Sequence, residues 1–347
     1  MRVTLLLIGI SAASLANQAE RLTPIFDGRT LDGWEQLEGK AKFTAENGMI
    51  VGTAVSANPS SFLCTKKPYG DLILEFEVQV DGDLNSGVQI RSHTYKTATT
   101  VFVWRDGQWW KRVHPAGRVH GYQIEIANKI TASGSIFDEG GRGWLNLIPG
   151  DGSAGKAFKD EEWNKYRIVA VGDSIKSWVN GILCADLVDP SDQSGFIGLQ
   201  VHGFKPQRLT QVRWRNIRVQ DLGEHTWQPL AKNVKMADFT VRMKFKGDKG
   251  DGNVFFRSGL RVASDGSLYD AAGRQLSKPD PIGVKLYYKP GDWNELAISA
   301  HGPRVVVHLN GIKTADVQTN VVKPGELKTT GGEVVFRDIE ILRPVKP

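Results

Sequence analysis

Short runs of alternating apolar and polar residues, separated by turn-forming residues, dominate the chain. The run from Leu72 to Gln79 alternates leucine, phenylalanine and valine with isoleucine, glutamate and glutamine, so one set lines each face of a strand. Asn180-Gly181 and Asn310-Gly311 end the apolar runs 168–179 and 305–309, and Asn-Gly pairs favour tight hairpin turns. The sequence shows no amphipathic pattern for a helix of more than three turns. The pattern predicts an all-β chain built as two antiparallel β-sandwiches.

Four sequence features occur twice, in the same order. They are 71–92 and 238–258, Trp163-Asn164 and Trp293-Asn294, Asn180-Gly181 and Asn310-Gly311, and 212–217 and 334–339. The period is too long for a solenoid repeat, so it predicts duplicated domains. We expect a first sandwich over residues 20–223 and a degenerate second one over 224–347.

The first 19 residues read as a signal peptide. Arg2 precedes an apolar run to Ile10, and small residues then offer cleavage sites near Ala16 or Ala19. The run is too short to span a bilayer, although it could instead form a buried first strand. No later run is long enough for a membrane span. These features predict an exported protein, periplasmic or extracellular.

Composition and charge add little about partners. The chain has 347 residues and a formal net charge of +6, but the Lys and Arg residues form no long block. Diffuse charge of this kind does not predict nucleic-acid binding. Cys64 and Cys184 are the two cysteines, and an exported protein could join them in a disulfide, but their spacing alone does not decide this. The oligomeric state is left open.

Three predicted strands carry an unusual polar face. One face of the strand 118–126 presents Gln123 and Glu125, while Tyr122, Ile124 and Ile126 line the other. The same alternation groups polar residues on one face of two further strands. One strand presents Gln89, Arg91 and His93, and the other presents Gln200 and His202. A solvated outer face is usual in antiparallel sandwiches. If the three strands belong to one sheet, the amides together with Glu, Arg and His favour the floor of a ligand groove instead.

Several motifs, in order, carry a resemblance to a known family. They are Phe26–Trp34, the Asn85-Ser86-Gly87-Val88 stretch through Arg91, His120–Glu125, Gly195–Gly203 and Arg215–Ile217. Over about residues 22–222 the chain resembles the 3-keto-disaccharide hydrolase domain family, also described as 3-keto-glucoside 1,2-lyase and 3-keto-2-hydroxy-glucal hydratase. The resemblance implies a concanavalin-like jelly roll whose concave sheet carries the ligand groove.

Two stretches depart from the family pattern. An insertion from Thr97 to Gly117 predicts a strand, an Asp-Gly turn and a second strand. Its tryptophans, Trp104, Trp109 and Trp110, could stack on sugar rings or could cover the sheet or the second domain. In the second copy Arg242 stands where the first has Glu75, the segment Leu199–His202 has no counterpart, and no strand with the Tyr-x-x-Glu pattern of Tyr122 and Glu125 is present. We therefore expect the second domain to be non-catalytic.

The resemblance implies chemistry on 3-keto-glucosides. The ketone acidifies the hydrogen on C2, a base removes it, and the group on C1 leaves by β-elimination; hydration then gives net hydrolysis. Glu125 is the expected base or metal ligand, His202 the expected acid/base or metal ligand, and Arg91 the expected enolate or hydroxyl clamp. A divalent cation could polarise the ketone, and no nucleotide cofactor is expected. The substrate-binding candidates are Gln123, Gln200, Tyr122, His120, Gln89, Asn85, Glu75, Asp138, Trp104 and Trp109.

Two other functions compete with this one. A sugar-binding protein without turnover would use the same groove and the tryptophans. Ordinary glycoside hydrolysis requires two carboxylates across the scissile bond, and the strand pattern that supplies them in laminarinase-like enzymes is absent. A nucleophile elbow of the Gly-x-Ser-x-Gly type is absent as well.

Overall fold

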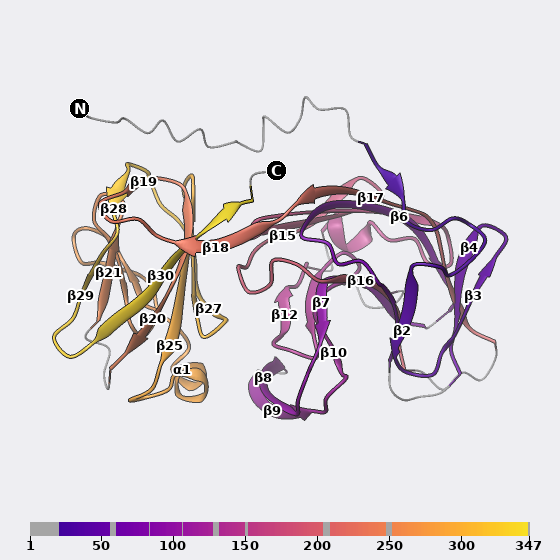
Figure 1. Cartoon of the computed structure of the whole chain (residues 1–347), viewed down its shortest axis with the longest axis horizontal. Coiled ribbons are helices and arrows are strands. Elements are labelled where there is room, and N and C mark those ends of the chain that lie inside the picture. The colour runs from indigo at the N-terminus through magenta and orange to yellow at the C-terminus, as the bar shows by residue number, and fades with distance from the viewer. Residues whose placement is uncertain are drawn as a thin grey trace.

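The protein is built almost entirely of strands (Figure 1). The computed structural model describes residues 21–55, 60–82, 84–105, 107–127, 132–149, 152–203, 209–247 and 252–345. The predicted signal peptide, residues 1–19, lies outside these ranges. Helix is confined, within the described ranges, to the 3₁₀ turn η2 (Ala154–Lys156) and the short helix α1 (Pro281–Tyr287). None of the helices in those ranges is long and apolar enough to cross a bilayer.

The first sandwich consists of two large sheets. In the described residues one sheet has eight strands in the order β15-β14-β13-β6-β17-β4-β3, with β1 paired to β17, and the other has nine in the order β2-β5-β16-β7-β10-β11-β12-β8-β9. The strands of the first sheet are β1 (Thr23–Pro24), β3 (Lys42–Glu46), β4 (Met49–Thr53), β6 (Asp71–Val80), β13 (Asn164–Val171), β14 (Ser174–Val179), β15 (Ile182–Val188) and β17 (Gln211–Gly223). Those of the second are β2 (Trp34–Glu38), β5 (Ser61–Thr65), β7 (Ser86–Thr94), β8 (Thr99–Arg105), β9 (Gln108–His114), β10 (Val119–Ile126), β11 (Ile136–Glu139), β12 (Gly143–Asn146) and β16 (Phe196–Val201).

One apolar core lies between these two sheets. Leu74 and Phe76 of β6 point into it from one side, and Val88 and Ile124 from the other; all four are buried. Alternation along each strand therefore sends the intervening side chains outward, as the sequence predicts. All the pairings in this sandwich are antiparallel except the contact of β12 with β8, at Gly143 and Trp104.

The second sandwich has its own core and smaller sheets. In the part of the chain that is described, its sheets run β18-β30-β20-β25-β26-β27, β24-β23-β22-β21-β29 and β19-β28. Their strands are β18 (His225–Pro229), β19 (Lys235–Met236), β20 (Phe239–Lys246), β21 (Asn253–Phe256), β22 (Leu260–Ala263), β23 (Leu268–Tyr269), β24 (Gln275–Ser277), β25 (Asn294–His301), β26 (Arg304–Leu309), β27 (Ile312–Gln318), β28 (Gly325–Glu326), β29 (Lys328–Thr330) and β30 (Val335–Pro344). Phe245, Phe256 and Ile298 are among the buried side chains of its core. The all-β prediction with two sandwiches is confirmed.

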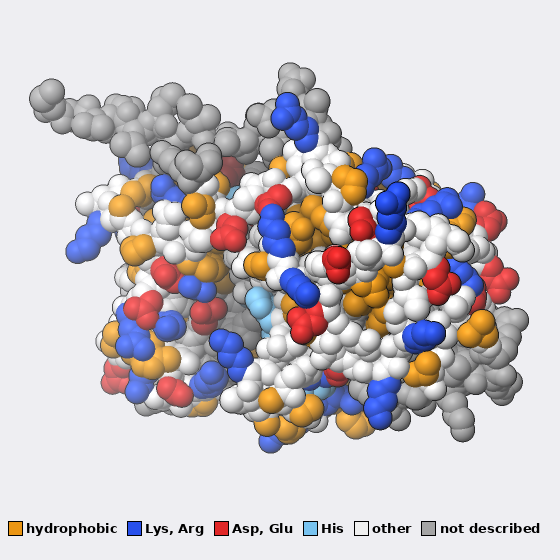
Figure 2. All heavy atoms as spheres, turned by 45° about the vertical axis from the view of Figure 1, so that its right-hand side comes forward, with side chains coloured by type: hydrophobic (Ala, Val, Ile, Leu, Met, Phe, Trp, Pro, Cys, Tyr) orange, Lys and Arg blue, Asp and Glu red, His pale blue; other side chains and the backbone are white. Residues whose placement is uncertain are grey.

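The two sandwiches lie side by side and are joined by adjacent strands (Figure 1). β17 of the first ends at Gly223, and β18, which pairs with β30 of the second, begins at His225. On the face shown in Figure 2, positive and negative side chains are interspersed. The domain limits 20–223 and 224–347 and the inactivity of the second domain stay predictions.

The features that occur twice in the sequence make the same contacts in both halves. Arg215 lies over the Trp163 ring with its guanidinium carbon 3.9 Å from the ring centroid, and Arg337 lies 3.6 Å from that of Trp293. The side chain of Asn180 donates to Asn164 Oδ1 at 2.8 Å, and the pair Asn310 and Asn294 repeats this bond at 2.8 Å. The two Asn-Gly turns have positive φ at both residues, as a type I′ turn requires. The run 168–179, predicted as a single strand, divides into β13 and β14 at a turn.

A buried arginine closes one end of each sandwich. Arg91 is fully buried with φ +46°, and its guanidinium donates to Gly70 O at 2.9 Å, Gly172 O at 2.6 Å and Asp71 Oδ1 at 2.8 Å. Arg257 in the second sandwich has φ +48° and makes the equivalent bonds, which go to Ala237 O, Gly302 O, Val321 O and Asp238 Oδ1. The prediction that Arg91 lies beside Glu125 and clamps the substrate is therefore wrong. Arg91 has a structural role, which we call its framework role.

A bulge in β7 explains the wrong placement. The register of β7 shifts against both neighbours near Arg91, which adds a residue to β7 and breaks the alternation of faces. Gln89 keeps the outward face, but Arg91 turns toward the end of the sandwich. Simple alternation from Gln89 to Arg91 could not show this.

The insertion forms the predicted hairpin, β8 and β9, at the edge of the nine-stranded sheet. Cys64 and Cys184 are both buried free thiols, so no disulfide joins them.

Removal of the Arg91 guanidinium tests its framework role. In Arg91→Ala, Asp71 stays buried without its guanidinium partner, and breaking such a pair costs about 3–5 kcal/mol. Arg218→Ala, which removes a half-exposed partner of Glu75, should cost no more than about 1 kcal/mol. Urea denaturation of both variants measures the difference. Equal midpoints for the two would contradict the framework role.

Candidate functional site

A layer of polar side chains covers the outward face of the nine-stranded sheet. Across neighbouring strands Gln123 pairs with Gln89, and Gly87 lies between Glu125 and Gln200 in the register. Glu139 of β11 pairs with Gly121, so it takes the same face as Gln123. We call this set the polar layer, and its members are Asn85, Gln89, Gln123, Glu125, Glu139 and Gln200.

The polar layer is packed rather than solvated. The exposed fractions are 0% for Gln89, 3% for Gln123, 1% for Gln200 and 6% for Glu125. Gly87 provides the space for this packing, because a Cβ there would lie 2.5 Å from Gln123 Cδ. A solvated outer face, the alternative that the sequence leaves open, is therefore wrong for these residues.

Glu125 has the most unusual environment in the layer. The side-chain amide of Asn85 donates to one carboxylate oxygen, and that of Gln123 donates to the other at 3.0 Å. Gln123 is itself held by a 2.8 Å bond from Gln89 Nε2, which fixes its amide orientation. Burial raises the pKa of Glu125, the two amide donors only partly oppose this, and the pKa lies at about 7. The carboxyl group can therefore exchange a proton near neutral pH.

A second carboxylate and an arginine complete the layer. Arg118 donates to Glu139 Oε1, and it donates to Glu38 Oε2 at 2.8 Å. Gln200 Nε2 lies 3.5 Å from the other oxygen of Glu139. Burial raises the pKa of Glu139 although Arg118 opposes the shift.

The prediction from sequence missed Glu139, Arg118 and Glu38 as site residues. Asp138 and Glu139 alternate on β11, so only one of them can share the face of Gln123. The hairpin register of β10 and β11 was the signal that could have distinguished the two acids.

His202 follows the end of β16, next to the layer. Its backbone N–H donates to Asn85 O at 3.3 Å, and Asn85 in turn holds Glu125. The residue is exposed at the surface, although nearby atoms desolvate the ring and lower the pKa of His202. The structure gives no contact between His202 and Glu125.

The described residues do not form a metal centre around Glu125. Both of its carboxylate oxygens accept amide hydrogens. No group of three or more His, Cys, Asp or Glu side chains in the described ranges could hold a metal ion. The divalent cation stays a prediction.

Glu75 lies on the other sheet of the sandwich, away from the polar layer. It is on β6 and pairs with Lys165 at 3.1 Å, Arg167 at 2.7 Å and Arg218 at 3.3 Å. The prediction that Glu75 binds substrate at the same site as Glu125 is therefore wrong, because parity within a strand does not say which sheet the strand joins.

Tyr122 and Asp138 face the inside of the sandwich. Tyr122 is 1% exposed in the core, and its hydroxyl donates to Asp189 Oδ1 at 2.6 Å. Asp138 pairs with Tyr122 in the register and forms an ion pair with Arg142. The two were predicted to bind substrate beside Glu125, and both predictions are wrong because these side chains lie on the opposite face of the sheet.

His120 also lies on the reverse face. It pairs with His93 in the register, and its ring stacks on Tyr95 with centroids 4.0 Å apart. Burial and the neighbouring His93 lower the pKa of His120 to about 4. The prediction that His120 contacts a ligand beside Gln123 is therefore wrong. His120 instead packs against an aromatic ring at the end of the sheet.

The tryptophans of the hairpin divide between two roles. Trp109 donates from Nε1 to Asp280 Oδ2 at 3.0 Å and lies edge-on to Tyr287 of α1. Trp109 therefore packs against the second domain, which is one of the two roles that the sequence leaves open. The prediction that Trp109 stacks on a substrate is wrong. Trp104 and Trp110 are exposed by 43% and 45%, and their predicted role in stacking stays a prediction.

A different aromatic pair stands on the same face as the polar layer. Phe137 pairs with Gln123 across β10 and β11, and Trp144 pairs with Phe137 across β11 and β12. The Phe137 and Trp144 rings meet edge to face with centroids 5.0 Å apart, and Trp144 is 39% exposed. Neither residue is among the site residues predicted from the sequence. A cavity of about 310 Å³ lies elsewhere, in the second sandwich, where Asp270, Arg274 and Val321 are among its lining residues.

The comparison with protein families identifies one family. The model of the 3-keto-alpha-glucoside-1,2-lyase-like domain matches residues 21–220 and again residues 223–342. No curated protein sequence matches the chain.

Solved structures are similar only at a low level. A Parabacteroides distasonis protein named as a candidate glycosyl hydrolase shares 16% identity over 62% of this chain and 98% of its own, with a TM-score of 0.38. A carbohydrate-binding module of Bacillus subtilis shares 18% over 54% and 95%, with a TM-score of 0.36. A Bacillus subtilis protein of galectin-like fold shares 8% over 55% and 90%, with a TM-score of 0.41. At such low TM-scores these likenesses carry no functional inference.

A single methyl group tests whether the amide layer sets the state of Glu125. Gly87→Ala forces Gln123 to move, and overpacking of this kind costs about 1–3 kcal/mol of unfolding free energy. Loss of the Gln123 donor should also raise the pKa of Glu125. Gly152→Ala is the matched control, because a Cβ at Gly152 meets no atom within 4 Å. Denaturation and a carboxyl titration by infrared spectroscopy measure both effects, and identical results for the two variants would contradict the packing.

Proposed function

The chain belongs to the 3-keto-alpha-glucoside-1,2-lyase-like domain family, and from this premise we propose that it cleaves 3-keto-glucosides, with Glu125 as the base. The observation that carries the proposal is the buried Glu125 carboxyl, whose pKa of about 7 is set by burial against two amide donors. A group with this pKa can both accept and return a proton at neutral pH.

The proposed reaction is a β-elimination. Glu125 takes the proton from C2, and the C–H electron pair forms an enolate with the ketone at C3. When the ketone re-forms, the pair makes the C1–C2 double bond and the oxygen on C1 leaves with the aglycone. The Glu125 carboxylic acid returns its proton to that oxygen, so the products are a 3-keto-2-hydroxy-glucal and an alcohol. Addition of water across the double bond would complete a net hydrolysis.

The other residues of the layer supply binding and orientation. Amide groups and the Arg118–Glu139 pair offer both donors and acceptors, which match sugar hydroxyl groups. His202, exposed beside Asn85 and with a lowered pKa, is proposed as a second acid/base for hydration. Trp144 and Phe137 provide an apolar surface next to Gln123. Two strand spacings, about 10 Å, separate β12 from β10, which is enough for more than one sugar ring.

A second candidate function is sugar binding without turnover. The observation that favours it is that both oxygens of Glu125 already have hydrogen-bond donors and the side chain is only 6% exposed. In that case the polar layer would hold hydroxyl groups and Glu125 would be part of its framework. Export to the periplasm or the exterior suits either function, and it too stays a prediction.

Glu125→Gln distinguishes the two functions. The variant keeps the shape of the side chain and removes the base, so kcat on a 3-keto-glucoside should fall about a hundredfold or more. In the unmodified protein log kcat/KM should rise with pH and level off above about 7, where Glu125 is ionised. Glu75→Gln, on the other sheet, should retain the activity. Full activity of Glu125→Gln would rule out Glu125 as the base, and retained sugar binding without any turnover in the unmodified protein would favour the binding function.

Trp144→Ala tests the proposed stacking surface. Loss of an aromatic contact of about 1 kcal/mol should raise KM roughly fivefold and leave kcat nearly unchanged. Trp104→Ala, which removes another exposed tryptophan, is the matched control. If the KM rise appeared with Trp104→Ala and not with Trp144→Ala, the hairpin would be the stacking surface instead.

A further inference from the structure

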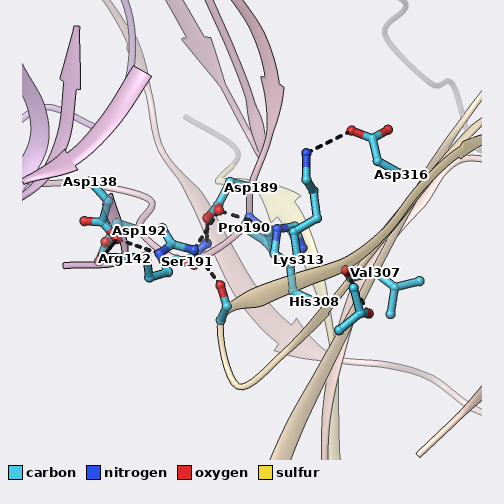
Figure 3. A network of polar contacts seen from close by, with 12 residues as sticks. Asp138, Arg142, Asp189, Pro190, Ser191, Asp192, Val307, His308, Lys313 and Asp316 are labelled. Carbon is cyan, nitrogen blue, oxygen red and sulfur yellow. Dashed lines mark hydrogen bonds and ion pairs between the residues drawn. The ribbon is translucent and has the colours of Figure 1, made fainter. Parts of the chain in front are cut away.

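The two sandwiches meet around a buried carboxylate, Asp189. It lies just after β15 and is 1% exposed. Figure 3 shows Asp189 together with Arg142 and His308. The Asp189 oxygens accept from the Tyr122 hydroxyl at 2.6 Å, from Arg142 Nη1 at 2.7 Å and from the backbone of Ser191 at 3.0 Å. Burial raises the pKa of Asp189, but Arg142 and then His308 outweigh that effect and hold the pKa well below its usual range. Asp189 is therefore a charged carboxylate that needs these partners.

Two of the contacts around Asp189 come from the second sandwich. His308 of β26 is buried, and its Nε2 lies 3.5 Å from Asp189 Oδ2, a polar contact that is longer than an ordinary hydrogen bond. Arg142 Nη1 also donates to Gly311 O at 2.7 Å, in the Asn-Gly turn after β26. The edge formed by β26 and this turn thus completes the shell of Asp189.

The same shell anchors the two strands that carry the acids of the polar layer. Tyr122, which holds Asp189 from β10, is adjacent in sequence to Gln123, the residue that donates to Glu125. Arg142, which bridges Asp189 and Asp138, fixes β11 directly beside Glu139. Contacts on the inner face of β10 and β11 therefore help to fix the positions of side chains on the outer face, because adjacent residues of a strand share one backbone.

We infer that the second sandwich is a positioning element of the site: His308 and the Gly311 turn, acting through Asp189 and Arg142, hold β10 and β11 in the geometry that the polar layer requires. The link to catalysis rests on the proposed function, whereas the effect on the state of Glu125 does not.

Other contacts between the sandwiches reach different elements. Arg304 pairs with Asp186 of β15 at 3.0 Å, and His301 pairs with Asp173 in the turn between β13 and β14 at 3.2 Å. Both aspartates belong to the opposite sheet and its turns, and neither contact touches β10 or β11. They supply a control that weakens the junction without disturbing the anchor of the site.

The test compares His308→Ala with Arg304→Ala in the full-length protein. The primary readout is the titration of Glu125, followed by the infrared carbonyl band of its protonated form and identified by the absence of that band from Glu125→Gln. If His308 positions β10, its loss admits water around Glu125, and the titration should move from about 7 toward the ordinary value of 4.5. Arg304→Ala should leave the titration in place even if it lowers the melting temperature equally. An unmoved titration in His308→Ala, or equal shifts in both variants, would overturn the inference.

Kinetics supply an independent measurement. For His308→Ala, kcat/KM on a 3-keto-glucoside should fall roughly tenfold to a hundredfold, and its rising limb should move to lower pH. His308→Gln keeps a hydrogen-bond donor, so it should recover part of the rate and part of the shift in the Glu125 titration. If His308→Ala does not fold, His308→Gln replaces it in the test. A titration of Glu125 that does not move in soluble His308→Gln would then count against the positioning role. If the unmodified protein lacks turnover, the proposed function fails, while the infrared titration still decides the positioning role.

Discussion

The Arg91 guanidinium, buried at the end of the first sandwich, is the interaction on which the site depends. A buried guanidinium requires several acceptors, and here they come from Gly70, Asp71 and the Gly172 turn. Arg91 reaches them because β7 contains a bulge with φ +46°. The bulge lets Gln89 stay on the outer face while Arg91 turns to the end of the sandwich. The bond from Gln89 to Gln123, and through it the orientation of Gln123 toward Glu125, follows from this geometry.

Burial of the polar layer has a cost that its own hydrogen bonds offset. Side-chain partners make this burial possible, because Gln89 donates to Gln123 and the half-buried Asn85 donates to Glu125. A carboxyl group in that layer is different, because two neutral amide donors do not fully compensate the loss of hydration. The result is a Glu125 pKa near 7, which is the property that makes the layer chemically interesting.

The two halves of the chain share a framework and differ in what they place upon it. Arg91 and Arg257 close their sandwiches with the same set of contacts, yet Glu125 and its amide partners have no counterpart in the second half. That half instead presents His308 to Asp189 and the Gly311 carbonyl to Arg142. A copy without the polar strands can therefore still contribute to the site, through the junction.

The sequence by itself determined the strands, their turns and the faces of their side chains, because alternation and Asn-Gly chemistry act over a few residues. It also determined that Gln123 and Glu125 share one face of their strand, opposite Tyr122, Ile124 and Ile126. That the strands of Gln89, Glu125 and Gln200 are neighbours in one sheet was decided by the tertiary structure. Only the tertiary structure decided that Arg91, Glu75 and Asp138 lie elsewhere, because a bulge, a choice of sheet and a register between strands are set by contacts between distant residues. The inclusion of Glu139 and Arg118, the burial that moves the pKa of Glu125, and the junction at Asp189 depend in the same way on which segments pack together, which a local pattern does not encode.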